Sequence, residues 1–346
     1  MKIKLVKLKA REGDFLLTID KLFFDVKGYL HPPDRIISFI RYYPSKRGER
    51  IVNKEKYAKI YELKKRFKFL KKKYPIYIYY DGVFHSIIQG VPINMVKKLY
   101  NPKEKVKELM KNNKFKVESE ALNLIQALGK EANQEINRFG VTGSILVNLF
   151  TNDSDLDVIV YGFKAAVKVY EALRKLIQER KEFKPCDKKE LYKIYLARGM
   201  NKALSFKDFY ENEKNKILQG KFHEKNYFIR CVKDWNEVKE AYGDEIYYPI
   251  GLSKIKAIVI NNEESILTPC KYEVSNIKVL SGRKALIKEI VSFRGRFCEA
   301  ASIGDKIIAR GKLEKVINAK DNSEFHRLIL GENSKDFLIV KEKSKT

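Results

Sequence analysis

Along the first hundred residues, hydrophobic and polar positions mostly alternate with the period of two that is typical of half-buried strands. This alternation predicts strands over residues 2–9, 22–30 and 35–43, followed by a hairpin over 75–80 and 83–89. Residues 54–73 instead carry hydrophobic side chains near helical spacing, which predicts an amphipathic helix with a basic back. His31, in the turn before the third strand, has no catalytic pattern beside it and is expected to be structural or at the surface. Residues 1–100 thus predict an α+β domain.

A helical period dominates the middle of the chain. Amphipathic helices are predicted over residues 118–137, 164–182, 188–198 and 205–218. Short hydrophobic stretches at 139–141 and 156–160, and a third at 226–233, read as strands between them. Asn101-Pro102 is a natural boundary before this region. We therefore expect a central domain over residues 101–253, in which helices pack on a mixed sheet.

From residue 254 the pattern changes to short strands separated by turn residues. Six strands are predicted over residues 256–260, 271–280, 286–298, 306–316, 325–330 and 337–341. This spacing suits a small antiparallel, barrel-like domain over residues 254–346, with an oligonucleotide-binding barrel as one candidate. The whole chain is expected to belong to the α+β class.

One stretch of the central region carries candidate chemistry. Residues 139–162 read FGVTGSILVNLFTNDSDLDVIVYG, in which Gly143-Ser144 forms a turn between a strand and a short hydrophobic helix expected over residues 145–150. The backbone N–H groups of such a turn, with the helix dipole, favour an anion. Asp155 and Asp157 alternate with Leu156 at the start of the next strand, so both carboxylates share one face. Two carboxylates so close repel each other unless a cation lies between them.

The Gly143-Ser144 turn followed by Asp155-Leu156-Asp157 resembles the signature of the DNA polymerase β-type nucleotidyltransferase superfamily. The resemblance implies a nucleotidyltransferase fold for the central domain. It also implies that Gly143 and Ser144 contact the triphosphate of a nucleotide such as ATP, while Asp155 and Asp157 bind Mg²⁺ or Mn²⁺. The implied reaction is transfer of a nucleoside monophosphate to a hydroxyl group.

The chain departs from this superfamily at the third carboxylate, which commonly activates the acceptor hydroxyl. Arg230 occupies the middle of the strand where that acid is expected, and its planar guanidinium suits a phosphate. Asp234, at the end of the strand, and Glu224, just before it, are the remaining candidates for the acid. An alternative is therefore a catalytically impaired, nucleotidyltransferase-fold protein that binds nucleic acid. The Asp-x-Asp pair also remains open to the simpler reading of a solvent-facing turn before a strand.

Composition bears on the partners. The net charge is +27, from 71 basic and 44 acidic residues, which favours RNA or DNA as the acceptor. The same surplus also fits a Lys-rich composition inherited from an AT-rich genome. No hydrophobic run reaches the length of a membrane span, so no membrane partner is expected. The four cysteines are scattered, as expected for free thiols in a cytoplasmic protein.

Overall fold

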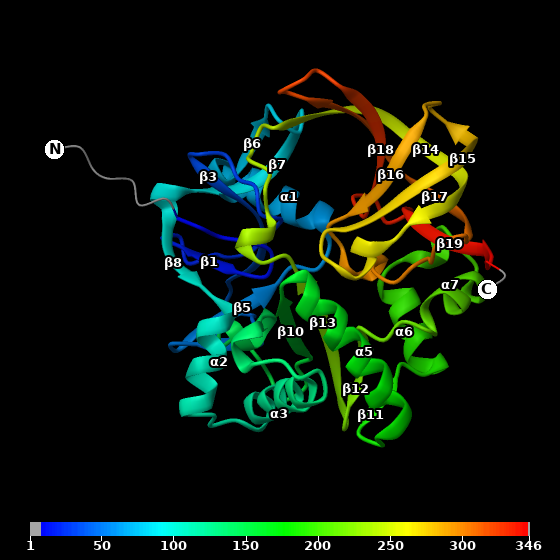
Figure 1. The fold of residues 1–346 in the computed structure, drawn as a ribbon. Coiled ribbons are helices and arrows are strands. Elements are labelled where there is room, and N and C mark those ends of the chain that lie inside the picture. The colour runs from blue at the N-terminus through cyan, green and yellow to red at the C-terminus, as the bar shows by residue number, and fades with distance from the viewer. Residues whose placement is uncertain (1–7, 345–346) are drawn as a thin grey trace.

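The computed structural model describes residues 8–344, so the strand expected over residues 2–9 lies almost wholly outside the described residues. The fold is mixed α+β, with three sheets that follow one another along the chain. In Figure 1 the blue and cyan N-terminal sheet, the green central region and the yellow to red C-terminal sheet surround a common centre. The α+β prediction is confirmed at this level.

The N-terminal sheet has eight strands, with the order β4-β5-β3-β2-β1-β8, while β7 pairs with both β3 and β6. The strands are β1 (Phe15–Thr18), β2 (Phe23–Val26), β3 (Arg35–Pro44), β4 (Arg50–Val52), β5 (Glu55–Lys59), β6 (Ile78–Asp81), β7 (Ser86–Pro92) and β8 (Val96–Tyr100). One helix, α1 (Leu63–Lys73), accompanies this sheet. Strands β6 and β7 form the predicted hairpin.

The prediction of a helix over residues 54–73 is wrong for the first half of this segment. Strand β5 occupies that half, and α1 begins only at Leu63. Asn53 and Lys54 have positive φ angles of 49° and 64°, as a tight hairpin turn requires. The turn pairs β4 with β5, and β5 also pairs with β3. Tyr57 is buried against Phe23, with ring centroids 5.3 Å apart. Sheet pairing and this burial outweigh the local helical spacing.

The central region forms a five-stranded sheet with the order β11-β12-β13-β10-β9, in which β10 and β13 are parallel. Its strands are β9 (Phe139–Val141), β10 (Leu156–Tyr161), β11 (Phe183–Pro185), β12 (Gln219–Phe222) and β13 (Lys225–Val232). Its helices are α2 (Pro102–Lys111), α3 (Lys116–Glu131), α4 (Gly143–Leu146), α5 (Phe163–Glu179), α6 (Lys188–Ala197) and α7 (Phe206–Glu213). Helices α3 and α5 contact each other and both contact β10, so their hydrophobic faces cover the strand that carries the Asp-x-Asp motif.

The C-terminal strands are β14 (Glu245–Asn261), β15 (Cys270–Gly282), β16 (Ile287–Ser292), β17 (Lys306–Asn318), β18 (Glu324–Leu330) and β19 (Phe337–Glu342). Five of them close a ring, β14-β15-β16-β18-β17-β14, and β19 pairs with β17. The ring is barrel-like, as predicted, but the β16–β18 pair is parallel and not antiparallel. The expected boundary after residue 253 falls within β14, because that strand is a long one that begins at Glu245.

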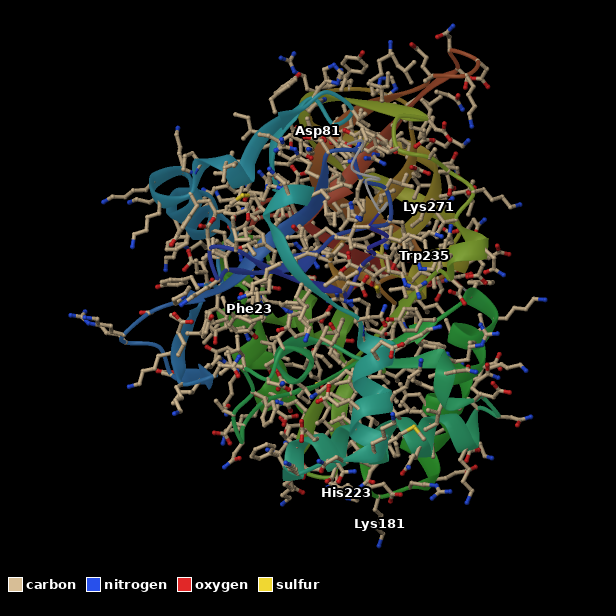
Figure 2. All side chains as sticks on the ribbon, turned by 90° about the vertical axis from the view of Figure 1, so that its left-hand side faces the viewer. Phe23, Asp81, Lys181, His223, Trp235 and Lys271 are labelled. Carbon is tan, nitrogen blue, oxygen red and sulfur yellow. The ribbon has the colours of Figure 1, made fainter. Side chains whose placement is uncertain are left out.

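Short 3-10 turns connect the elements at Pro75–Tyr77, Ile93–Met95, Ile136–Arg138, Met200–Lys202, Trp235–Glu237, Glu263–Ile266 and Gly295–Phe297. In Figure 2, β13 runs from the turn at His223, at the outer edge of the central region, toward Trp235 near the middle of the molecule.

All four cysteines are free thiols. None of the helices within residues 8–344 is both long and hydrophobic enough to cross a bilayer.

Candidate functional site

A cavity of about 290 Å³ lies between the N-terminal and central sheets. Its walls contain the five residues that the sequence assigned to metal or nucleotide binding, namely Gly143, Ser144, Asp155, Asp157 and Arg230. The rest of the lining is Phe15, Asp25, Arg41, Tyr42, Arg50, Lys59, Tyr61, Thr142, Asp153 and Ser154. The expected convergence of the glycine–serine turn and the two aspartates is therefore what the structure shows.

Strand pairing brings the turn and the aspartates together. Strand β9 runs antiparallel to β10, and the Thr142 N–H donates to the Asp157 carbonyl at 2.9 Å. The next residue, Gly143, has φ +66°, and a Cβ atom placed on it would lie 2.0 Å from Oδ2 of Asp157. The Asp157 carboxylate thus lies directly against the backbone of the turn, where only glycine fits.

The helix after the turn differs from the expected one. Helix α4 spans only Gly143–Leu146, a single turn that begins two residues earlier than the predicted 145–150 segment. A helix of four residues has a weak dipole, so the anion-binding role expected of its N-terminus has little support. Ser144 is buried in the cavity wall. Positive side chains elsewhere in the lining are the stronger anion ligands.

The two aspartates differ in environment. Asp155 precedes β10, is exposed, and accepts a hydrogen bond from Nδ2 of Asn226 at 3.3 Å. Asp157 is partly buried, and its burial, followed by the nearby charge of Asp155, raises its pKa to about 6. The doubly ionised pair is therefore unfavourable by itself, as expected where a cation belongs.

These donors fit one divalent cation. Asp155 and Asp157, which both line the cavity, would be the protein ligands. Mg²⁺ commonly binds through one or two carboxylates, with waters and substrate phosphates completing its shell. An open two-carboxylate site beside a cavity matches that pattern.

Arg230 lines the cavity, but it also has a structural partner. Its Nη1 lies 2.6 Å from Oε1 of Glu12, which is fully buried and also pairs with Lys27 at 2.8 Å. Arg230 therefore links β13 to the N-terminal segment. Its charge is largely balanced by Glu12, which makes it a weaker phosphate ligand than its sequence position indicates.

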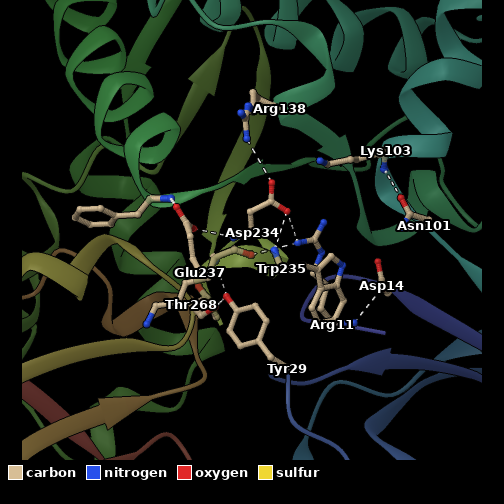
Figure 3. Close-up of polar contacts among 12 residues, drawn as sticks. Arg11, Asp14, Tyr29, Asn101, Lys103, Arg138, Asp234, Trp235, Glu237 and Thr268 are labelled. Atoms are coloured by element: carbon tan, nitrogen blue, oxygen red, sulfur yellow. Dashed lines mark hydrogen bonds and ion pairs between the residues drawn. The ribbon is translucent and has the colours of Figure 1, made fainter. Parts of the chain in front are cut away.

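Neither candidate for the third carboxylate lines the cavity. Asp234 caps the turn Trp235–Glu237 and pairs with Arg11 at 3.1 Å and Arg138 at 3.3 Å, as Figure 3 shows. Glu224 is exposed in the turn between β12 and β13.

The N-terminal sheet contributes another carboxylate to the cavity, that of Asp25, which pairs with Lys27 at 2.9 Å. Although burial opposes it, the charges of Lys27, Arg230 and Arg41 lower the pKa of Asp25 to about 2.

Sequence reasoning missed the N-terminal half of the site, which consists of Asp25, Arg41, Arg50 and Lys59. Lys59 was not predicted as a site residue, because its segment was assigned to a helix. The Asn53-Lys54 pair between two short alternating stretches was the signal for a hairpin there. The side chains of Asp25 and Arg41 had no local signal, since they approach the aspartates only through the packing of the two sheets.

The fold and site together define an α+β protein with a cavity of mixed charge between its first two sheets. The uncharacterized protein MJ1086 of Methanocaldococcus jannaschii is 31% identical to this chain over 340 residues, which cover 95% of this chain and 98% of that protein. The chain belongs to the same family as this archaeal protein. No protein-family model matches the chain. No solved structure matches it either.

Proposed function

We propose that the protein is a metal-dependent nucleotidyltransferase that transfers a nucleoside monophosphate from a nucleoside triphosphate to a hydroxyl group. The observation that supports this most is the contact between the Gly143 turn and Asp157, with Asp155 in the same cavity wall. The central sheet, with β10 between β9 and β13, is compatible with a nucleotidyltransferase fold.

The residues of the cavity have separate tasks in this proposal. Asp155 and Asp157 would hold Mg²⁺ or Mn²⁺, which would neutralise charge on the phosphates. The turn at Gly143 packs against the Asp157 carboxylate and keeps it in place. The acceptor hydroxyl would attack the α-phosphorus in line and lose its proton to solvent, the bond to the β-phosphate would break, and pyrophosphate would leave. Asp25 is a poor base for that hydroxyl, because its low pKa leaves it little affinity for a proton.

RNA or DNA is the acceptor that the rest of the chain favours. The net charge of +27 attracts polyanions. A five-stranded barrel such as β14–β18 is the architecture of oligonucleotide-binding domains. Binding to RNA or DNA should weaken steeply as salt concentration rises.

A second candidate is a protein that binds nucleotide and nucleic acid without turnover. Arg230 stands on β13 where a third acid was expected, and neither Asp234 nor Glu224 lines the cavity. Without that acid the activation of the acceptor hydroxyl would be impaired.

An assay for transfer of labelled nucleotide distinguishes the nucleotidyltransferase from the binding protein without turnover. The wild type is incubated with each of the four nucleoside triphosphates, RNA or DNA ends, and Mg²⁺, Mn²⁺ or EDTA. Metal-dependent transfer that disappears in the Asp155→Asn, Asp157→Asn double variant supports the enzyme. Asp321→Asn, in the exposed β17–β18 turn, is the matched control and should retain transfer. Nucleotide and nucleic-acid binding without any transfer supports the second candidate, and a wild type that does neither contradicts both.

A further inference from the structure

We propose that Arg41 and Lys59, both from the N-terminal sheet, bind the triphosphate of the nucleotide in the cavity that contains Asp155 and Asp157. This inference rests on the proposed function, which it extends by assigning the polyphosphate ligands. It also makes the N-terminal domain part of the nucleotide site.

Arg41 lies at an irregularity in β3. In the pairing of β2 with β3, Phe23 is opposite Tyr42 and Phe24 is opposite Ile40, so Arg41 is the extra residue of a β-bulge. Its carbonyl accepts a hydrogen bond from the Ile60 N–H at 3.0 Å. Bulges next to functional sites change the direction in which a side chain points. Here the bulge coincides with the arginine that lines the cavity.

Lys59 is the neighbouring cation on the next strand. It ends β5 and lies opposite Tyr42, the residue that follows Arg41. Its Nζ lies 4.9 Å from the centre of the Tyr61 ring, and both residues line the cavity. Partial burial, followed by the charges of Arg41 and Arg50, lowers the pKa of Lys59 to about 8. The positive charge of Lys59 is thus disfavoured by burial and by repulsion from the neighbouring arginines. A bound anion would reduce this repulsion.

The other cations of the lining already have partners. Arg230 is paired with Glu12, and Nη1 of Arg50 donates to the carbonyl of Leu149. Within residues 8–344, none of Arg41, Lys59 and Arg50 has a carboxylate within 4.0 Å, but Arg41 and Lys59 also make no side-chain hydrogen bond. The cavity therefore has two cations without an ion-paired or hydrogen-bonded partner on one wall and a pair of carboxylates on another.

A triphosphate chain complements both walls. Its oxygens suit a guanidinium, which can donate two parallel hydrogen bonds, and an ammonium, which acts as a point charge. The same chain would also bind the cation at Asp155 and Asp157. A monophosphate has a single anionic group and cannot satisfy both walls equally well. The ligand class that fits is therefore a nucleoside triphosphate with its divalent cation.

Calorimetry with Arg41→Gln and Lys59→Met tests this assignment. Each variant is titrated in Mg²⁺ with the four nucleoside triphosphates, the corresponding monophosphates, inorganic tripolyphosphate and a short single-stranded RNA. We expect triphosphate and tripolyphosphate affinity to fall by about ten- to hundredfold, because a charge-assisted hydrogen bond is lost. Monophosphate and RNA affinity should change less than about threefold. Lys56→Met and Arg47→Gln, exposed on β5 and in the β3–β4 connection, are the controls and should bind as the wild type.

Thermal unfolding of each variant shows whether it is folded. The inference is overturned if folded Arg41→Gln and Lys59→Met bind triphosphates as tightly as the wild type, or if they lose RNA affinity alone. The second result would assign these residues to the acceptor. A wild type that transfers nucleotide while both variants bind triphosphate normally contradicts only this inference. A wild type that binds triphosphate through Arg41 and Lys59 but never transfers it contradicts only the proposed function.

Discussion

Glu12 of the N-terminal segment and Arg230 of β13 form an ion pair, with Oε1 and Nη1 2.6 Å apart, that joins the first two sheets. Glu12 has no exposed surface and also accepts from Nζ of Lys27 at 2.8 Å and from the Gly28 N–H at 2.9 Å. The carboxylate of Glu12 thus binds both the connection between β2 and β3 and strand β13, which pairs with β10. The wall of the cavity depends on this contact.

Glu12→Gln should destabilise the protein strongly. Arg230 would lose its closest carboxylate, whereas Lys27 would keep Asp25. Removing one partner of a buried ion pair costs about 3–5 kcal/mol in the free energy of unfolding. Urea unfolding followed by circular dichroism measures the change. Glu55→Gln, which removes the exposed pair with Lys21, should cost at most about 1 kcal/mol, and equal effects of the two substitutions would contradict the prediction.

Gly143→Ala should weaken metal-dependent nucleotide binding. The added Cβ would lie 2.0 Å from Oδ2 of Asp157, and the residue would have to keep φ near +66°. The carboxylate must then move away from the turn, and we expect metal-dependent triphosphate affinity to fall at least about tenfold, the effect of one charge-assisted contact. Gly82→Ala is a suitable control, because nothing lies within 4 Å of a Cβ there. Calorimetry of both variants with Mg²⁺ and nucleotide is the measurement, and unchanged binding in Gly143→Ala would argue against the site.

Asp234→Asn should affect stability and leave nucleotide transfer intact. Asp234 pairs with Arg11 and Arg138 and caps a 3-10 turn, outside the cavity (Figure 3). Loss of its charged hydrogen bonds should cost about 1–3 kcal/mol in the free energy of unfolding. The transfer rate of the folded variant, measured with saturating nucleotide, should stay within about twofold of the wild type. A folded variant with a large loss of transfer and wild-type nucleotide affinity would instead make Asp234 the missing acid.

The contribution of His31 to the stability of the protein should fall below about pH 6.5. Burial lowers the pKa of His31 to about 4, while its ring is hydrogen-bonded to the carbonyl of Ala10 and the N–H of Ile37. The unfolded chain has a histidine pKa near 6.5 and binds the proton first, so acid favours unfolding. This contribution is fully present above pH 6.5 and is lost as pH falls toward 4. The free energy of unfolding changes by at most about 1.4 kcal/mol per pH unit for one histidine.

Urea unfolding of the wild type and His31→Gln at pH 8 and pH 5 measures this contribution. The wild type should lose about 2 kcal/mol more than the variant between the two pH values, since about one proton is taken up over 1.5 pH units. Equal losses would show that His31 does not titrate as its burial indicates. His326→Gln, a substitution at a partly exposed histidine of β18, is the control for a general histidine effect.

The sequence by itself determined the features that depend on neighbours along the chain. The α+β class, the β6–β7 hairpin and the contact of the Gly143 turn with Asp157 all follow from local spacing, because β9, the turn and β10 are joined by short connections. Strand alternation likewise predicted that Asp155 and Asp157 face the same space.

Only the tertiary structure decided what faces those aspartates. Lys59 belongs to a strand because β5 pairs with β3 and β4, although its segment has helical spacing. Arg41 lines the cavity from a bulge whose position depends on the register of β2 against β3. Arg230 is balanced by Glu12, more than two hundred residues earlier in the chain. Pairing between distant strands and the burial of charge depend on contacts that no local pattern records, so this half of the site could not be predicted from the sequence.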